Sequence, residues 1–224
     1  VWDLRHQPVP HDTSVFQPPN LDAGPRGPLV MPGEFEVALS TASADDPSSV
    51  LATTHLEVRW DPLMPLPESE IRARYEFTLA LYEMQQIGYH AQVQAAKLLE
   101  RARISVDSLK ALEDETPVVL ADSLLSVMED ALSEIRTRNS DLRGWWRGLI
   151  GEFDGGPSVI GSMTGPTAAQ EARLAWTRAQ FAEAVDDLDA ILRETAPELT
   201  RILEEAGVPP FELPERGEGP AAYR

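Results

Sequence analysis

The sequence predicts an α+β protein in which a small N-terminal β-domain is followed by an antiparallel bundle of three long helices. Proline is dense at the start, with 11 of the 19 prolines in residues 1–67, and scarce from there to residue 206. A proline-dense stretch cannot be helical, whereas a proline-poor one can. Apolar residues alternate with polar ones within 34–60 and then recur every three or four residues, which are the periods of a strand and of a helix.

Two strands are predicted in the proline-rich part, after a long surface loop over residues 7–28. Apolar and polar residues alternate in 34–39 and in 54–60, so each strand would bury one face. The buried face would be Phe35, Val37 and Leu39 in the first strand and Leu56, Val58 and Trp60 in the second. The polar turn over 42–49 joins them into a hairpin. Because a two-stranded hairpin is marginal in water, we expect further strands or a partner surface to complete this domain.

Three helices are predicted, over residues 67–113, 116–138 and 166–206, with a glycine-rich connection over 139–165. Their apolar stripes indicate bundle packing. In the first helix the stripe is Ile71, Tyr75, Leu79, Tyr82, Gln86, Tyr89, Val93 and Ala96. In the second it is Leu120, Leu124, Val127, Ala131 and Ile135. In the third, a heptad seam comprises Leu174, Phe181, Val185, Leu188, Leu192, Leu199 and Ile202. The predicted domains are residues 1–66, 67–208 and an extended tail over 209–224.

Charge and composition exclude several classes of function. The formal net charge is −18, which repels phosphate backbones and anionic lipid headgroups, so we expect no nucleic-acid partner. The chain has no cysteine, which excludes disulfides, Cys-ligated metals and thiol catalysis. No run of about 18 apolar residues is present, so no transmembrane segment is predicted.

The motifs predict no catalytic residue, no cofactor-binding residue and no metal ligand, and hence no enzyme. His6, His11, His55 and His90 lie in three different contexts, and no nucleophile motif accompanies them. Asp186, Asp187 and Asp189 lack the glycine and terminal glutamate of a calcium loop, and we expect Asp186 and Asp189 to face solvent. A catalytic triad or a carboxylate pair assembled from distant positions stays open as an alternative.

The most unusual local feature is an aromatic segment between glycines, residues 145–153. One interpretation is a loop tucked against the bundle. The other is a docking patch for a partner protein or a bilayer interface, where large aromatics are favoured. On the second interpretation the partner-docking residues are Trp145, Trp146, Leu149 and Phe153.

Several stretches together resemble a known family. These are VWDLR at 1–5, GPLVMPGEFEVAL at 27–39, LEVRWDP at 56–62, MTGP at 163–166 and LEEAGVP at 203–209. They are similar to the C-terminal region of bacterial sortilin-like, BNR-repeat "glycosyl hydrolase" proteins. The resemblance implies an Ig-like β-sandwich followed by a helical segment. The β-propeller that would carry a sugar or peptide site is missing, and no Asp-box repeat occurs, so the hydrolase activity is not implied.

These observations predict a non-catalytic structural or interaction subunit of a larger extracytoplasmic or membrane-associated protein assembly. Its partners would be other protein subunits, and its location periplasmic or extracellular, at most peripheral to a membrane complex. The absence of an initial methionine suggests that a leader was removed or that the chain is a piece of a longer protein. The alternative is an accessory C-terminal fragment of a propeller-type carbohydrate-active or peptidase-like exported protein.

Overall fold

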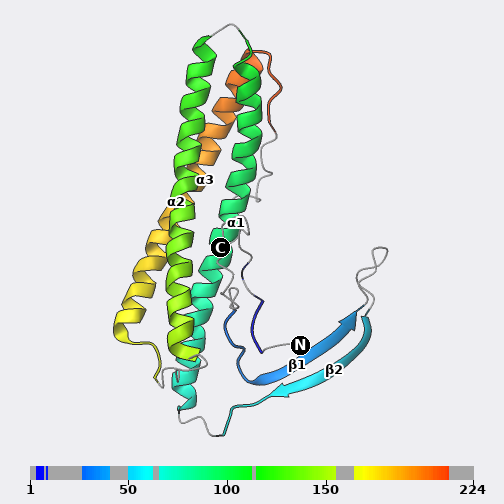
Figure 1. The fold of residues 1–224 in the computed structure, drawn as a ribbon, viewed down its shortest axis with the longest axis vertical. Coiled ribbons are helices and arrows are strands. Elements are labelled where there is room, and N and C mark those ends of the chain that lie inside the picture. The colour runs from blue at the N-terminus through cyan, green and yellow to red at the C-terminus, as the bar shows by residue number, and fades with distance from the viewer. Residues whose placement is uncertain are drawn as a thin grey trace, which may run out of the picture.

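Three long helices form an antiparallel bundle, and a β-hairpin projects sideways from one end of it (Figure 1). The structure, a computed structural model, describes residues 4–7, 9, 27–40, 50–62, 66–112, 115–154 and 164–211. The strands are β1 (Gly33–Ser40) and β2 (Val50–Val58), and the helices are α1 (Glu68–Leu109), α2 (Glu115–Asp154) and α3 (Ala168–Glu205). The three predicted long helices are therefore present.

The predicted Ig-like β-sandwich is wrong. Within the described ranges the sheet has two strands, β1 and β2, paired antiparallel, and the one further β-bridge joins Arg5 to Leu29. The chain is thus mostly helical. Alternation of apolar and polar residues is enough to predict a hairpin, but it carries no information on how many further strands lie beside it.

The second helix is much longer than predicted, because residues 139–154, expected as a glycine-rich connection, continue α2. Gly144 and Gly148 are exposed positions inside this helix. A glycine in a helix interior costs only about 1 kcal/mol relative to alanine. Burial of Trp146 and Leu149 on the opposite side of the same turns offsets that cost. The glycines were therefore misleading as signs of a loop.

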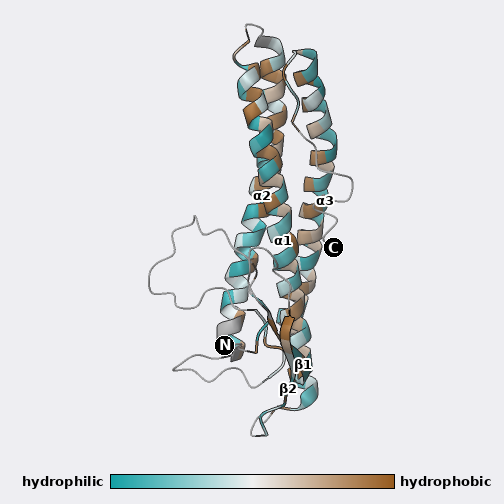
Figure 2. Cartoon of the chain, turned by 90° about the vertical axis from the view of Figure 1, so that its right-hand side faces the viewer, coloured by the Kyte–Doolittle hydropathy of each residue, from teal (hydrophilic) through white to brown (hydrophobic). Residues whose placement is uncertain are grey.

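The helix faces were predicted correctly for α3 but not for α1 and α2. Of the predicted α3 seam, all but the half-buried Leu174 are buried. Of the predicted stripes, only Tyr82 in α1 and Ile135 in α2 are buried. The true α2 seam comprises Ala121, Leu125, Met128, Leu132, Ile135, Asn139, Leu142, Trp146, Leu149 and Phe153. Figure 2 shows hydrophobic and hydrophilic positions alternating along each helix.

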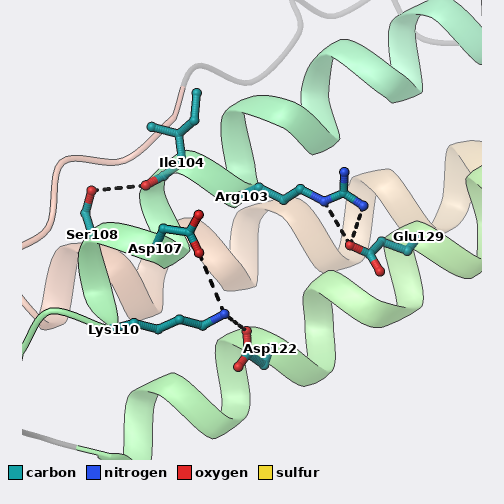
Figure 3. Close-up of polar contacts among 7 residues, drawn as sticks. All are labelled: Arg103, Ile104, Asp107, Ser108, Lys110, Asp122 and Glu129. Atoms are coloured by element: carbon teal, nitrogen blue, oxygen red, sulfur yellow. Dashed lines mark hydrogen bonds and ion pairs between the residues drawn. The ribbon is translucent and has the colours of Figure 1, made fainter.

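Ion pairs fasten α1 to α2 near the far end of the bundle (Figure 3). The Arg103 guanidinium donates to Glu129 Oε1 at 2.7 and 2.9 Å, and Lys110 Nζ lies 2.9 Å from Asp122 Oδ1. The hydrogen bond from Lys110 to Asp122, together with the nearby charge of Asp107, raises the pKa of the lysine. The flank of α2 that faces α1 is thus occupied by charged partners.

The described N-terminal residues pack on α1. The Val9 side chain is buried in the bundle core, and the Tyr82 hydroxyl donates to the Gln7 carbonyl oxygen at 2.8 Å. Next to them the His6 amide donates to the Pro28 carbonyl oxygen at 2.9 Å, which closes the bridge between Arg5 and Leu29. The bundle therefore includes a short piece of the N-terminal region in addition to its three helices.

Both ends of α3 have recognisable caps. Thr167 and Gln170 form a capping box, and α3 begins at Ala168, two residues after the predicted start at Pro166. At the other end Gly207 has φ +76°, and the Val208 amide donates to the Leu203 carbonyl oxygen at 2.8 Å. Glycine adopts this left-handed conformation without strain, and it ends the helix here.

Candidate interaction surface

One face of the hairpin carries three exposed apolar side chains, Val37, Leu39 and Leu56. The register pairs Phe35 with Leu56, Val37 with Thr54 and Leu39 with Ala52, which places their side chains on one side of the sheet. Val37 and Leu56 are exposed there, and Leu39 keeps 61% of its surface accessible. We call Val37, Leu39 and Leu56 the apolar hairpin face. Exposed apolar residues that adjoin one another on a single face are typical of interaction sites.

The other face of the hairpin is acidic. Glu34 lies directly opposite Glu57, and Glu36 lies opposite His55. Like charges directly opposite each other destabilise a strand pair, although Arg59 beside Glu57 offsets part of this repulsion. The hairpin is therefore amphipathic, with a neutral apolar face and a negatively charged polar face.

The hairpin stands apart from the helices. No Cα atom of β1 or β2 comes within 8 Å of a Cα atom of any described helix, and Figure 1 shows both strands running away from the bundle axis. The bundle cannot supply the apolar cover that a two-stranded sheet requires in water. The sequence pattern identified both strands, but only the structure shows that Val37, Leu39 and Leu56 are exposed.

The aromatic segment lies in α2, and three of its four predicted docking residues are core residues. Trp146, Leu149 and Phe153 are buried, and the ring of Phe153 packs edge-on against Phe77 of α1 at 6.2 Å between centroids. The Arg74 guanidinium donates to the Phe153 carbonyl oxygen at 2.5 Å and lies over its ring. Side chains that fill the bundle core are not available to a partner.

Trp145 is the one half-buried member of the predicted set. Its ring packs edge-on against Phe77, with 6.0 Å between centroids, and the Arg173 guanidinium lies over it at 4.4 Å from the ring centroid. A docking role for these four residues stays a prediction, and only Trp145 presents any surface to a partner.

The structure does not bring the three described histidines together. His6 stacks on Tyr75 and lies beside Tyr82, His55 is exposed on the acidic face of the hairpin, and His90 is exposed on α1. His11 lies outside the described residues. Among the residues that are described, no group of three or more His, Asp or Glu side chains is arranged to hold a metal ion.

The acidic cluster of α3 differs from its prediction at one position. Asp186 and Asp187 are exposed, but Asp189 is buried and forms an ion pair with Arg193 one turn later. The expectation that Asp189 faces solvent is therefore wrong. Its carboxylate has a structural partner, and the neighbouring Asp187 lies on the side of α3 that faces α2.

None of the helices, over the stretches that are described, is both long and apolar enough to cross a membrane. Comparisons with protein-family models, with curated proteins and with solved structures found no match to this chain. The resemblance to bacterial sortilin-like proteins stays a prediction that rests on the residues quoted for it.

Proposed function

We propose that this chain is a non-catalytic interaction subunit of a larger extracytoplasmic or membrane-associated protein assembly, and that the hairpin is its docking arm. The exposed side chains of the apolar hairpin face carry this proposal. A partner that removes Val37, Leu39 and Leu56 from water is bound more tightly, because burial is favourable by about 25 cal/mol per Å² of apolar surface. The bundle supplies a rigid base from which the arm projects.

The occupant of the apolar hairpin face is an apolar β-sheet face of another subunit, with a basic rim. Glu34, Glu36 and Glu57 lie on the opposite face of this two-stranded sheet, and together with the net charge of −18 they give the arm a negative field, which favours lysine and arginine at the edge of the partner. A second copy of this chain would bring the same glutamates and another net charge of −18 to the contact. Anionic lipid is repelled for the same reason.

The test is the size of the native complex in cells that make the protein. The double variant Val37→Thr with Leu39→Thr keeps strand propensity but removes the apolar surface. The matched control is Ala38→Thr, between these positions on the opposite face. We expect the wild type and the control to elute in a high-mass fraction and the double variant to elute at the mass of the free chain. If both variants stay assembled, or the wild type is free, the proposal is wrong.

The charge of the rim is tested separately with two designed ten-residue strands, one alternating valine with lysine and the other valine with glutamate. In fluorescence anisotropy the lysine strand is expected to bind the wild type at least about ten-fold more tightly than the glutamate strand. The lysine strand should not bind the double variant Val37→Thr with Leu39→Thr with this affinity. Equal binding of both strands would contradict a basic partner, and a concentration-dependent dimer in sedimentation would identify a second copy instead.

A further inference from the structure

A second surface runs along the seam between α2 and α3. A hollow of about 290 Å³ lies between these helices, with Ala131, Ala184, Leu188 and Ile191 among its lining residues. Further along the same seam a wider hollow of about 580 Å³ is lined by Gly144, Trp145, Gly148, Leu149, Glu152, Ala169, Gln170 and Arg173. Both hollows lie on the same two helices, so the seam forms a groove with two depressions.

The apolar stripe that the sequence places on α2 leads into this groove. Leu120, Leu124, Val127 and Ala131 follow one another at steps of four, three and four residues, which places them on one side of the helix. They lie beside the buried α2 seam rather than in it: Leu120 is 54% exposed and Val127 is 42% exposed. The helix therefore carries more apolar surface than a three-helix core uses.

The two flanks of α2 differ in a way that indicates an external partner. On the flank toward α1, Asp122 and Glu129 are held by ion pairs with Lys110 and Arg103, as Figure 3 shows. On the other flank the stripe is apolar, with Leu120 and Val127 exposed and Leu124 and Ala131 half-buried. Two apolar stripes side by side are typical of a helix that packs against helices on both sides, as in a four-helix bundle.

Charge selects the kind of helix that fits. Glu134, Glu183 and Asp187 line the smaller hollow, and the one cation among its lining residues, Arg138, is already paired with Glu134 at 2.7 Å. An acidic rim over an apolar floor attracts lysine and arginine on either side of an apolar stripe. At the wider hollow, a Cβ atom added at Gly144 or Gly148 would meet nothing within 4 Å, so the backbone of an incoming helix can approach closely.

We infer that the groove between α2 and α3 binds an amphipathic helix of another protein, whose apolar stripe lies along Leu120, Leu124, Val127 and Ala131 and whose flanks are basic. From Gly148 to Leu120 the groove follows 28 residue steps of α2, roughly 42 Å at about 1.5 Å per residue. A second copy does not fit, because it would place the same acidic rims against each other. This inference is independent of the hairpin, since it uses a different part of the molecule.

The probe is a pair of designed 21-residue helices that share one leucine stripe and differ only in having lysine or glutamate beside it. Each is labelled with fluorescein and titrated with the full-length chain at physiological salt. We expect the lysine helix to bind and the glutamate helix to bind at least about ten-fold more weakly. The double variant Leu120→Gln with Val127→Gln should bind the lysine helix about ten-fold more weakly than the wild type does, although its charge is unchanged.

The matched control is Ile104→Gln with Leu112→Gln, which removes two other exposed apolar residues outside the groove. Glutamine is a good helix former, so both double variants should keep the circular dichroism of the wild type. The affinity of the control for the lysine helix should stay within about two-fold of the affinity of the wild type. The inference is overturned if both helices bind equally, if the control weakens binding as much, or if the hairpin variant Val37→Thr with Leu39→Thr abolishes it.

Discussion

Asn139 of α2 lies against Gly88 of α1, and its Nδ2 donates a hydrogen bond to the Gly88 carbonyl oxygen at 2.8 Å. The same amide nitrogen donates to Gln92 Oε1 at 3.0 Å, and the whole Asn139 side chain is buried. A buried polar contact of this kind favours one alignment of neighbouring helices over others. Gly88 is required for it, because the helices approach too closely there for a side chain on α1.

The first prediction is that Gly88→Ala destabilises the fold by about 1–3 kcal/mol, the usual cost of overpacking a core. An added Cβ would overlap Asn139 Oδ1 and lie 2.5 Å from Phe181 Cζ. This cost should outweigh the roughly 1 kcal/mol by which alanine is the better helix former. Urea unfolding followed by circular dichroism measures the difference.

Gly148→Ala is the matched control. It replaces a glycine of α2 whose added Cβ would meet nothing within 4 Å. Here helix propensity acts alone, and the free energy of unfolding should rise by up to about 1 kcal/mol. If both alanine variants are equally stabilised, the close approach of α1 and α2 at Gly88 is wrong.

The second prediction is that Asn139→Ala partly relieves the effect of Gly88→Ala. Two of the three atoms nearest to the added methyl group belong to Asn139, and the third belongs to Phe181. The double variant should therefore be more stable than the sum of the single changes predicts, by roughly 0.5–3 kcal/mol. A double-mutant cycle gives this coupling directly, and a coupling of zero would show that the two residues do not meet.

The third prediction concerns the α3 seam. Leu188 is 1% exposed, and Leu188→Ala should lower the free energy of unfolding by about 2–5 kcal/mol. Trp176 on the same helix is 62% exposed, and Trp176→Ala should change stability by less than about 0.5 kcal/mol. The reverse order of the two effects would mean that α3 is rotated about its axis.

The fourth prediction separates a core role from a docking role in the aromatic segment. Trp146→Ala should cost about 3–5 kcal/mol, because it empties a buried site. Trp145→Ala should cost about 1–2 kcal/mol, from its contacts with Phe77 and Arg173. Thermal and urea unfolding of the two variants would test this. A folded Trp146→Ala variant of unchanged stability would restore the docking interpretation for that residue.

The fifth prediction is a pH dependence. Burial raises the pKa of the Tyr82 hydroxyl, and the hydrogen bond from Gln86 lowers it in part. A group whose pKa is raised by folding contributes stability below its unfolded pKa, about 10 for tyrosine, and loses it as the pH rises through the folded pKa. The wild type should therefore lose stability more steeply than Tyr82→Phe as the pH rises above about 10.

At pH 7 the Tyr82→Phe variant should be less stable by about 0.5–1.5 kcal/mol, because it loses the hydrogen bond to the Gln7 carbonyl oxygen. Unfolding free energies at a series of pH values give both effects. Identical pH slopes for the two proteins would mean that Tyr82 is solvated and that the N-terminal segment does not pack on it.

The sequence by itself determined the hairpin, the existence of three long helices and the buried face of α3. The α3 seam was readable because its large apolar residues, such as Phe181, Leu188 and Leu199, keep a regular helical spacing. The seams of α1 and α2 were not readable in this way. Their buried positions include small residues such as Ala91, Ala95 and Ala121, while larger apolar residues lie beside them.

Only the tertiary structure decided which of two apolar stripes on α2 is core and which is open. Leu120 and Val127 are as apolar as Leu125 and Met128, and their burial differs because α1 and α3 cover one stripe and not the other. The same holds for the hairpin, whose alternation fixes two faces but not their cover. Local periodicity reports which side chains share a face, whereas exposure depends on residues far away in the chain, and this is why the candidate surfaces emerged from the fold.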